Sequence, residues 1–344
     1  MNSSHHIIVI GASAGGVETL IEVVARLPEE LPAPVFVVLH IPPFVASSLP
    51  EILSRSGPLP AVHPNDGEVI NAGVIYIAPP DHHLLVENGS VAVKKGPKEN
   101  RFRPSIDALF RSAAYIYGPR AIGVVLSGAL DDGTSGLWSI KRLGGITIVQ
   151  EPNQARFESM PRSALEHVEV DYRLPSTEIG ALLGLLAKES PIADVEVESD
   201  LKTLISTEIQ IASEGGAFQK GIMSLGTLTP FTCPECHGVL VRIAEGKMSR
   251  FRCHTGHAYT DSALLEAVME STGDVLWQVI RSLEESAMLL SHMGQHLAQA
   301  GDADRAEVFF AKAHQLEQRS NAFHADVLNH ESLSGDNLGQ KPEE

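Results

Sequence analysis

Three side chains whose types could support hydrolysis each follow a strand-like segment. Ser13 lies in the stretch "GASAG", after the apolar run 7–10 and before a helical pattern. This is the strand, turn and helix context of a nucleophile elbow with the pattern G-x-S-x-G. His40 ends the run "VFVVLH", and Asp132 follows the run "IGVVLSG". A serine nucleophile, a histidine base and a carboxylate that orients the base together form a hydrolytic triad.

The same residues also have interpretations without hydrolysis. A dinucleotide site needs G-x-G-x-x-G and an acidic residue about 20 positions further on, but here Ser13 replaces the middle glycine and the second strand ends in His40. Ser13 could also be only a small residue in a tight turn, next to a helix that begins near Gly15 and favours a phosphate or an oxyanion. His82 and His83 follow the turn "APPD"; His83 could line the cleft, but we expect both in a surface loop.

Strand-like and helix-like segments alternate over the first half of the chain, which predicts a doubly wound, mostly parallel α/β sheet. The expected strands are rich in Val and Ile, as strands buried on both faces are. Ligand sites in open α/β sheets lie beyond the carboxyl ends of the strands. A first strand that lies between the strands preceding His40 and Asp132 would therefore bring both side chains close to Ser13. These matched positions favour the triad.

The first half of the chain resembles the catalytic domain of the chemotaxis protein-glutamate methylesterases, the CheB family. The matching segments, between Ile7 and about Ala187, are "VIGASAGGVETL", "VVLHIPP", "GVIYIAPPDHHL", "RPSIDALFRSAA", "GVVLSGALDDGTSGL" and "ESMPRSAL". The resemblance implies a doubly wound α/β fold and a serine esterase that needs no cofactor for catalysis. Such an enzyme hydrolyses glutamate methyl esters on chemoreceptors, releases methanol and often deamidates glutamine at the same sites.

The resemblance also implies a role for each candidate residue. Ser13 is then the nucleophile, His40 the base and Asp132 the orienting carboxylate, and the backbone N–H groups of Ala14 and Gly15 form the oxyanion hole. Familiar members begin with a phosphoacceptor receiver domain, whereas the matching segments here start at the beginning of the sequence. We therefore expect no receiver domain and no control by phosphorylation within this chain.

The three cysteines of the chain gather in one short segment, with the spacing of a metal site. "FTCPECHG" is followed by "CHTGH", and the pattern C-x2-C…C-x3-H supplies four tetrahedral zinc ligands. These ligands are Cys233, Cys236, Cys253 and His257. His254 and His237 compete for the fourth position, and a redox-active C-x-x-C is the alternative, although no thioredoxin-like βαβ pattern surrounds it. Such a small zinc-ribbon-like segment has little core, so we expect structural zinc to stabilise it.

Composition divides the chain into further segments. After the methylesterase-like domain at 1–190 comes the segment 191–230, whose stretch "SEGGAFQKGIMSLGTLTP" predicts a linker with a short helix before it. The zinc-ribbon-like segment 231–260 follows, and apolar periodicity over 261–330 predicts a helical hairpin. The polar tail 331–344 is expected to be disordered. Because a mobile linker would precede it, we expect the C-terminal region to recruit partners without taking part in the chemistry.

The acidic composition restricts the classes of partner. The formal net charge is -17, from 43 acidic and 26 basic residues, which argues against nucleic acid because its phosphates need a basic surface. Three cysteines and the absence of a secretory signal predict a cytoplasmic setting. The expected partners are a methylated chemoreceptor-like substrate, a receptor methyltransferase or another signalling protein, and a second copy bound through the hairpin. The alternative function is a non-catalytic signalling scaffold with an esterase fold.

Overall fold

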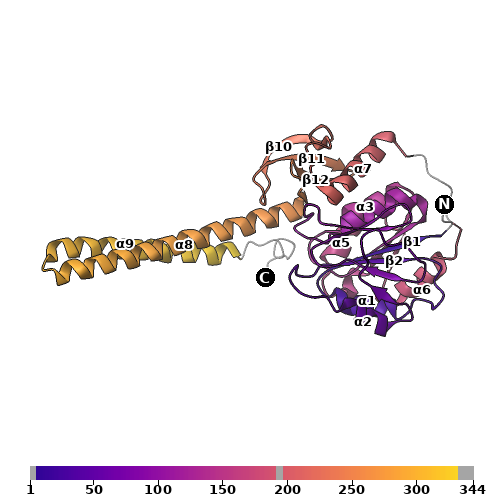
Figure 1. Cartoon of the computed structure of the whole chain (residues 1–344), viewed down its shortest axis with the longest axis horizontal. Helices are drawn as coiled ribbons and strands as arrows, with labels where there is room; N and C mark the ends of the chain where they lie inside the picture. Colours follow the sequence, from indigo (N-terminus) through magenta and orange to yellow (C-terminus); the bar gives the residue numbers. More distant parts are fainter. Residues whose placement is uncertain (1–4, 191–196, 332–344) are drawn as a thin grey trace. The chain divides into compact units, whose positions relative to one another are not determined.

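The computed structural model describes residues 5–190 and 197–331. Its contacts divide the chain into two compact units, with the boundary between Leu264 and Leu265. The first unit contains a parallel sheet covered by helices and a smaller antiparallel sheet, and the second contains two long helices (Figure 1). The tail expected at 331–344 lies outside the described residues except for Glu331, which ends the last helix.

A seven-stranded sheet forms the centre of the first unit, and its strand pairs are parallel. In sheet order the strands are β3 (Ala61–Val62), β4 (Ile75–Ile77), β2 (Val35–Leu39), β1 (Ile7–Ala12), β7 (Ala121–Val125), β8 (Ile146–Gln150) and β9 (Tyr172–Leu174). A separate antiparallel pair consists of β5 (His83–Val86) and β6 (Val91–Lys94). The parallel α/β fold predicted from the sequence is confirmed, and β1 lies between β2 and β7, the order that the predicted triad requires.

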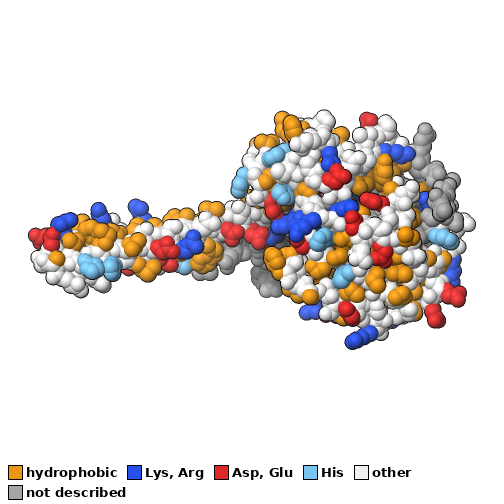
Figure 2. All heavy atoms as spheres, viewed as in Figure 1, with side chains coloured by type: hydrophobic (Ala, Val, Ile, Leu, Met, Phe, Trp, Pro, Cys, Tyr) orange, Lys and Arg blue, Asp and Glu red, His pale blue; other side chains and the backbone are white. Residues whose placement is uncertain are grey.

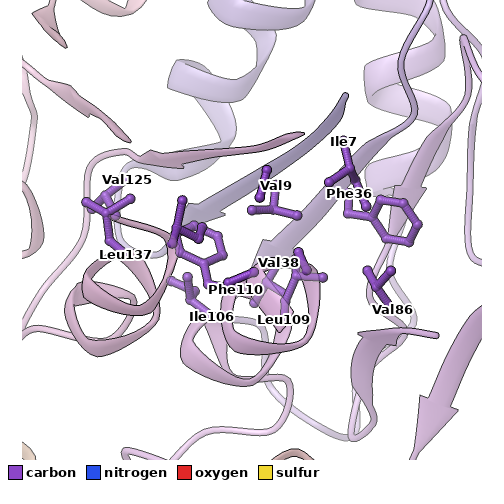
Figure 3. Close-up of a cluster of buried hydrophobic side chains, with 14 of the residues drawn as sticks. Ile7, Val9, Phe36, Val38, Val86, Ile106, Leu109, Phe110, Val125 and Leu137 are labelled. Atoms are coloured by element: carbon purple, nitrogen blue, oxygen red, sulfur yellow. The ribbon is translucent and has the colours of Figure 1, made fainter. Parts of the chain in front are cut away.

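Both faces of this sheet have a hydrophobic core, because successive side chains of a strand point to opposite faces. Ile7 and Val9 of β1 belong to one core, which Figure 3 shows, and Ile8 and Ile10 belong to the other. The first core is covered by α3 (Ile106–Tyr117), α4 (Thr134–Arg142), α5 (Ser159–His167) and α7 (Ser199–Glu214), and the second by α1 (Gly16–Val24), α2 (Leu49–Ser56) and α6 (Ser176–Leu186). The sheet is therefore a rigid support for the loops at its carboxyl edge.

The segment 213–230, expected to be a linker, is packed into the first unit. Ala217 and Ile222 are fully buried against Val241 and Ile243. Glycines at 215, 216 and 221 have positive φ values of 73°, 68° and 80°, which turn the chain between α7 and the next strand. Glycine-rich turns in a packed segment have the same composition as a flexible linker, so the composition alone was misleading.

A four-stranded antiparallel sheet follows α7 in the same unit. Its strands are β10 (Thr227–Thr232), β11 (Val239–Glu245), β12 (Met248–Cys253) and β13 (Ala258–Thr260). Val241 and Ile243 of β11 are buried on one face of this small sheet, against Ile222, and Leu240 and Phe251 are buried on the other. We call these four strands with their connecting turns the ribbon.

The second unit is an antiparallel pair of helices, formed by α8 (Asp261–Gln299) from Leu265 onward and by α9 (Ala303–Glu331). Buried small and aliphatic side chains lie between them, namely Ile280, Ala287, Ala306 and Ala313. Hydrophobic side chains also reach the surface of this pair (Figure 2), among them Trp277, Met288, Leu289, Met293 and Val308. Among the described helices, none combines the length and the apolar character that crossing a membrane requires.

Candidate active site

The serine turn connects the end of β1 to the start of α1. Gly15 has a φ of 68°, and a Cβ at this position would lie 2.9 Å from Cβ of Arg156 and 3.0 Å from Oγ of Ser127. The N–H of Ser13 donates to the carbonyl of Ser127 at 2.9 Å, and the Ser127 hydroxyl donates to the carbonyl of Ala14 at 2.8 Å. Only glycine fits this turn without strain, and Ser127, which follows β7, fixes the position of Ser13.

The three residues predicted as a triad lie in hydrogen-bond contact. Nδ1 of His40 lies 3.0 Å from Oγ of Ser13, and Nε2 of His40 lies 2.8 Å from Oδ2 of Asp132. The side chains of His40 and Asp132 are 3% and 2% exposed. When Nε2–H donates to the carboxylate, Nδ1 is free of a proton and accepts the Ser13 hydroxyl. The contacts run in the order serine, histidine and aspartate, which is the order of a hydrolytic triad.

Asp132 is held in place by donors from α3 and from the loop before it. Besides His40, its carboxylate accepts the N–H of Ile106 at 2.7 Å, the hydroxyl of Ser105 at 3.0 Å and the side-chain amide of Asn100 at 2.9 Å. Burial by itself raises the pKa of Asp132, but the hydrogen bond and charge of His40 and the other donors outweigh it and hold the pKa below its ordinary value. Asp132 is therefore the ionised partner of His40.

Two further aspartates beside Asp132 are kept closer to neutral. Burial, followed by the negative charge of Asp132, raises the pKa of Asp107 well above its ordinary value. Burial also raises the pKa of Asp131 to about 6, against hydrogen bonds from Thr260 and Ser262. Oδ1 of Asp131 accepts the Thr260 hydroxyl at 2.7 Å. Of the adjacent pair 131 and 132, the structure thus brings Asp132 to His40, as the sequence predicts.

Three residues of the site were not predicted from the sequence. The ring of Phe102 stacks on that of His40, with centroids 3.8 Å apart, and Asn100 contacts Asp132. His83 was expected in a surface loop, but it is fully buried. Its Nε2 lies 2.8 Å from the carbonyl of Pro97, and its Nδ1 accepts the N–H of Ser105 at 3.2 Å. Burial lowers the pKa of His83, as suits a neutral structural histidine. No motif or spacing in the sequence distinguishes Asn100, Phe102 or His83 from other residues of their types.

The comparison with protein families identifies this arrangement. A model described as CheB methylesterase matches residues 8–183, which include the serine turn, His40 and Asp132. The chain belongs to the CheB methylesterase family. A crystal structure of the Thermotoga maritima CheB methylesterase catalytic domain is similar at a TM-score of 0.52 and 37% sequence identity, and the match covers 54% of this chain and 100% of that one.

Relatives of this CheB-family chain are named as protein-glutamate methylesterases. A protein of Leptospira interrogans named "Putative protein-glutamate methylesterase/protein-glutamine glutaminase" is 38% identical over 180 residues, covering 52% of this chain and 93% of the relative. The Thermotoga maritima protein-glutamate methylesterase/protein-glutamine glutaminase is 38% identical over 180 residues, covering 51% of this chain and 52% of the relative. The similarity thus ends near the end of the parallel sheet, and the ribbon and helix pair lie beyond it.

The ribbon of this CheB-family chain contains a second constellation, which could hold a metal ion. One ligand atom from each of four side chains lies within 4.8 Å of the others; the four are Cys233, Cys236, Cys253 and His257. Sγ of Cys236 lies 3.6 Å from Sγ of Cys253, and Nδ1 of His257 lies 3.6 Å from both Cys233 and Cys253. Bond lengths of about 2.3 Å to sulfur and about 2.0 Å to nitrogen place tetrahedral ligand atoms about 3.5–3.8 Å apart, so the side chains fit such an ion.

The competing histidines lie outside this group of ligand atoms. A Cβ on Gly238 would lie 2.2 Å from Nδ1 of His254, so this ring packs closely on the backbone of the first cysteine turn. His237 occupies that turn with a φ of 58°. The N–H of His257 donates to Sγ of Cys253 at 3.2 Å, and the hydroxyl of Tyr259 lies 3.5 Å from Sγ of Cys233. Contacts of this kind orient ligands around a bound metal.

Proposed function

We propose that this chain is a serine hydrolase that removes methyl esters from glutamate side chains of chemoreceptor-like proteins. The observation that carries the proposal is the hydrogen-bonded series Ser13, His40 and Asp132 at the elbow of a CheB-family sheet. The alternative of a non-catalytic scaffold gives no reason for an intact series of this kind. Deamidation of glutamine, which the names of the relatives include, proceeds through the same acyl chemistry with ammonia as the leaving group.

The arrangement supports a two-step mechanism. Nδ1 of His40 accepts the hydroxyl proton of Ser13 as Oγ attacks the ester carbonyl, and Asp132 stabilises the imidazolium that forms. His40 then returns the proton to the methoxy group, methanol leaves, and Ser13 holds the glutamyl group as an ester. A water molecule that donates its proton to His40 attacks this ester, which releases the glutamate carboxylate and restores the serine.

The oxyanion of each tetrahedral intermediate needs donors close to Ser13. We assign this role to the backbone N–H groups of Ala14 and Gly15, which directly precede α1. The first N–H groups of a helix have no partner within the helix, and the helix dipole favours negative charge at this end. All groups that the mechanism requires come from the chain, so no cofactor enters the catalysis.

For the metal constellation, we propose that the bound ion is zinc in a structural role. The donor set of three thiols and one imidazole favours zinc, and four protein ligands leave no open position for a substrate. When bound, zinc would cross-link the turn that contains Cys233 and Cys236 to the turn between Cys253 and His257. The ribbon is then a metal-dependent module, and the helix pair that follows it is a hairpin module.

We propose a cytoplasmic setting, where a chemoreceptor-like substrate exposes its methylated glutamates. The apolar side chains on the surface of the second unit support binding of a signalling partner, such as a receptor methyltransferase, or of a second copy of the chain.

Methanol release from methylated receptor membranes tests the proposed activity. We expect the protein to release methanol and its Ser13→Ala variant to release several orders of magnitude less, because loss of a triad member removes most of the acceleration. The Ser13→Ala variant should fold normally, since this side chain fills no core. His82→Gln, which changes a histidine outside the triad, serves as the matched control and should remain active. Equal methanol release by Ser13→Ala and the unchanged protein would overturn the proposal.

A further inference from the structure

We infer that the ribbon is a positioning part of the active site, which it reaches through Thr260 and Asn100. The inference rests on the proposed esterase function and revises the expectation that the C-terminal region takes no part in the chemistry. Its basis is a continuous set of hydrogen bonds between β13, the loop 99–103 and the triad. All of these residues belong to the first unit.

β13 is hydrogen-bonded to the loop 99–103. The N–H of Asn100 donates to the carbonyl of Ala258 at 2.8 Å, and the N–H of Ala258 donates to the carbonyl of Lys98 at 3.2 Å. The N–H of Thr260 donates to Oδ1 of Asn100 at 3.0 Å. β13 therefore fixes both the backbone and the side-chain orientation of Asn100.

The loop 99–103 in turn contacts two residues of the proposed triad, Asp132 and His40. Nδ2 of Asn100 donates to Oδ1 of Asp132 at 2.9 Å and to Oδ2 of Asp107 at 2.8 Å. Two residues further on, the ring of Phe102 covers the ring of His40. Asn100 and Arg101 have φ values of 50° and 73°, a region that residues with a Cβ adopt only where the surroundings impose it. The loop thus depends on outside support to hold Asn100 and Phe102 in place.

Thr260 also forms a direct hydrogen bond to the residue next to Asp132. Its hydroxyl donates to Oδ1 of Asp131, the residue before the triad aspartate, at 2.7 Å. The hydroxyl oxygen of Thr260 also accepts the N–H of Ala263 at 3.1 Å and so caps the start of α8. Thr260 is 4% exposed and Asn100 is 2% exposed, so water does not replace these bonds.

A buried ionic cluster holds the ribbon against the parallel-sheet region. Its members are Glu99, Arg111, Glu208, Glu245, Arg250 and Arg252, each at most 2% exposed. Arg252 of β12 donates to Glu99 at 2.7 Å and to Glu208 at 2.9 Å, and Glu99 also pairs with Arg111 of α3. The three positive and three negative side chains balance each other. Since Glu99 begins the loop 99–103, the ribbon holds that loop at its first residue as well.

Two of the four metal-site residues lie just before β13, since Cys253 is the last residue of β12 and His257 directly precedes β13. The N–H of Cys253 donates to the carbonyl of His257 at 3.0 Å, which closes the turn that leads into Ala258. A metal ion bound by both residues would fix this turn and the start of β13. Metal loss would therefore act on Asp132 and His40 through Asn100 and Phe102, without any contact between metal and substrate.

Variants of Thr260 test the inference, because Thr260 is hydrogen-bonded to both Asn100 and Asp131. We expect Thr260→Val to lower kcat for a small soluble methyl ester about 10- to 100-fold, with KM changed by less than about threefold, because triad geometry and not substrate binding is affected. Thr260→Ser keeps the hydroxyl and should restore kcat. Thr229→Val is the matched control, since the Thr229 hydroxyl donates to the carbonyl of Leu240 within the ribbon at 2.8 Å. Full kcat in both Thr260→Val and Asn100→Ala would overturn the inference.

A second measurement follows the His40 to Asp132 hydrogen bond without using activity. The proton of this bond gives a deshielded NMR signal, assigned by its loss in His40→Gln. We expect removal of the metal by a chelator to weaken this signal and to slow the labelling of Ser13 by a fluorophosphonate at least tenfold, and zinc alone to restore both. An unchanged signal in metal-free protein would contradict the inference. If the unchanged protein hydrolyses no ester, the proposed function fails, and the NMR signal still decides the inference.

Discussion

The ring of Phe102 lies almost parallel to the ring of His40, with 9° between the planes and 3.8 Å between the centroids. The stack restricts rotation of the imidazole, whose two nitrogens must face Ser13 and Asp132 at the same time. An aromatic face also attracts the positive charge that the imidazole acquires during the reaction. Phe102 is thus a positioning residue for the proposed base.

Replacement of Phe102 by alanine should slow the reaction. We expect Phe102→Ala to lower kcat for a small methyl ester about 10- to 100-fold, because small displacements of a base have large effects on rate. Phe102→Tyr keeps the stacked ring and should stay within about threefold of the unchanged protein. Steady-state kinetics on the three proteins checks this, and equal kcat for Phe102→Ala and Phe102→Tyr would contradict it.

Asp131 should make stability depend on pH in mildly acidic solution. Its folded pKa is about 6, above its ordinary value of 3.8, because of burial. Below about pH 4 the carboxyl is protonated in both states, but between about pH 4 and 6 only the unfolded state loses the proton, so up to about 3 kcal/mol of folding free energy is lost as the pH rises. Asp131→Asn removes this loss and keeps an acceptor for Thr260.

Denaturant unfolding at pH 4 and at pH 7 measures this effect. The stability of Asp131→Asn relative to the unchanged protein should be more favourable at pH 7 than at pH 4, by up to about 3 kcal/mol. Other carboxyl groups titrate in both proteins and cancel in the difference. A difference that stays constant between the two pH values would show that Asp131 is not held protonated by its surroundings.

Breaking the buried ionic cluster should strongly destabilise the first unit. Arg252→Met leaves Glu99 and Glu208 short of a buried positive partner, and we expect a loss of about 3–5 kcal/mol in the free energy of unfolding. Arg242→Met is the matched control, because Arg242 is an exposed residue of β11 and such changes alter stability by about 0.5 kcal/mol or less. Comparable unfolding curves for the two variants would argue against a structural role for the cluster.

Metal analysis of histidine variants tests the ligand set. Protein purified without chelator should contain about one zinc ion per chain, in keeping with one closed tetrahedral site. His257→Ala should lose most of the zinc, whereas His254→Ala should keep it, since His254 is not one of the four residues whose ligand atoms lie together. Elemental analysis that finds no metal in the unchanged protein, or greater loss in His254→Ala, would reject the assignment.

The sequence by itself predicted the features that depend on local pattern. Ser13 stands in a strand, turn and helix pattern that short-range sterics allow only with glycine at position 15, where φ is 68°. Val-rich and Ile-rich strands that alternate with helices require a parallel sheet covered on both faces. The spacing of Cys233, Cys236, Cys253 and His257 likewise brings their ligand atoms within 4.8 Å of one another through two short turns.

Only the tertiary structure decided which distant residues support the site. Asn100 and Thr260 are polar residues without a motif, and their hydrogen bond joins positions 160 residues apart. Arg252 and Glu99 look like surface charges in the sequence, yet they form a buried pair at 2.7 Å. The glycine-rich segment before β10 resembles a linker, but Ile222 is buried in a core. Burial and partner choice are properties of the packed chain, because a charge or a glycine has the same local signature whether it meets water or another segment.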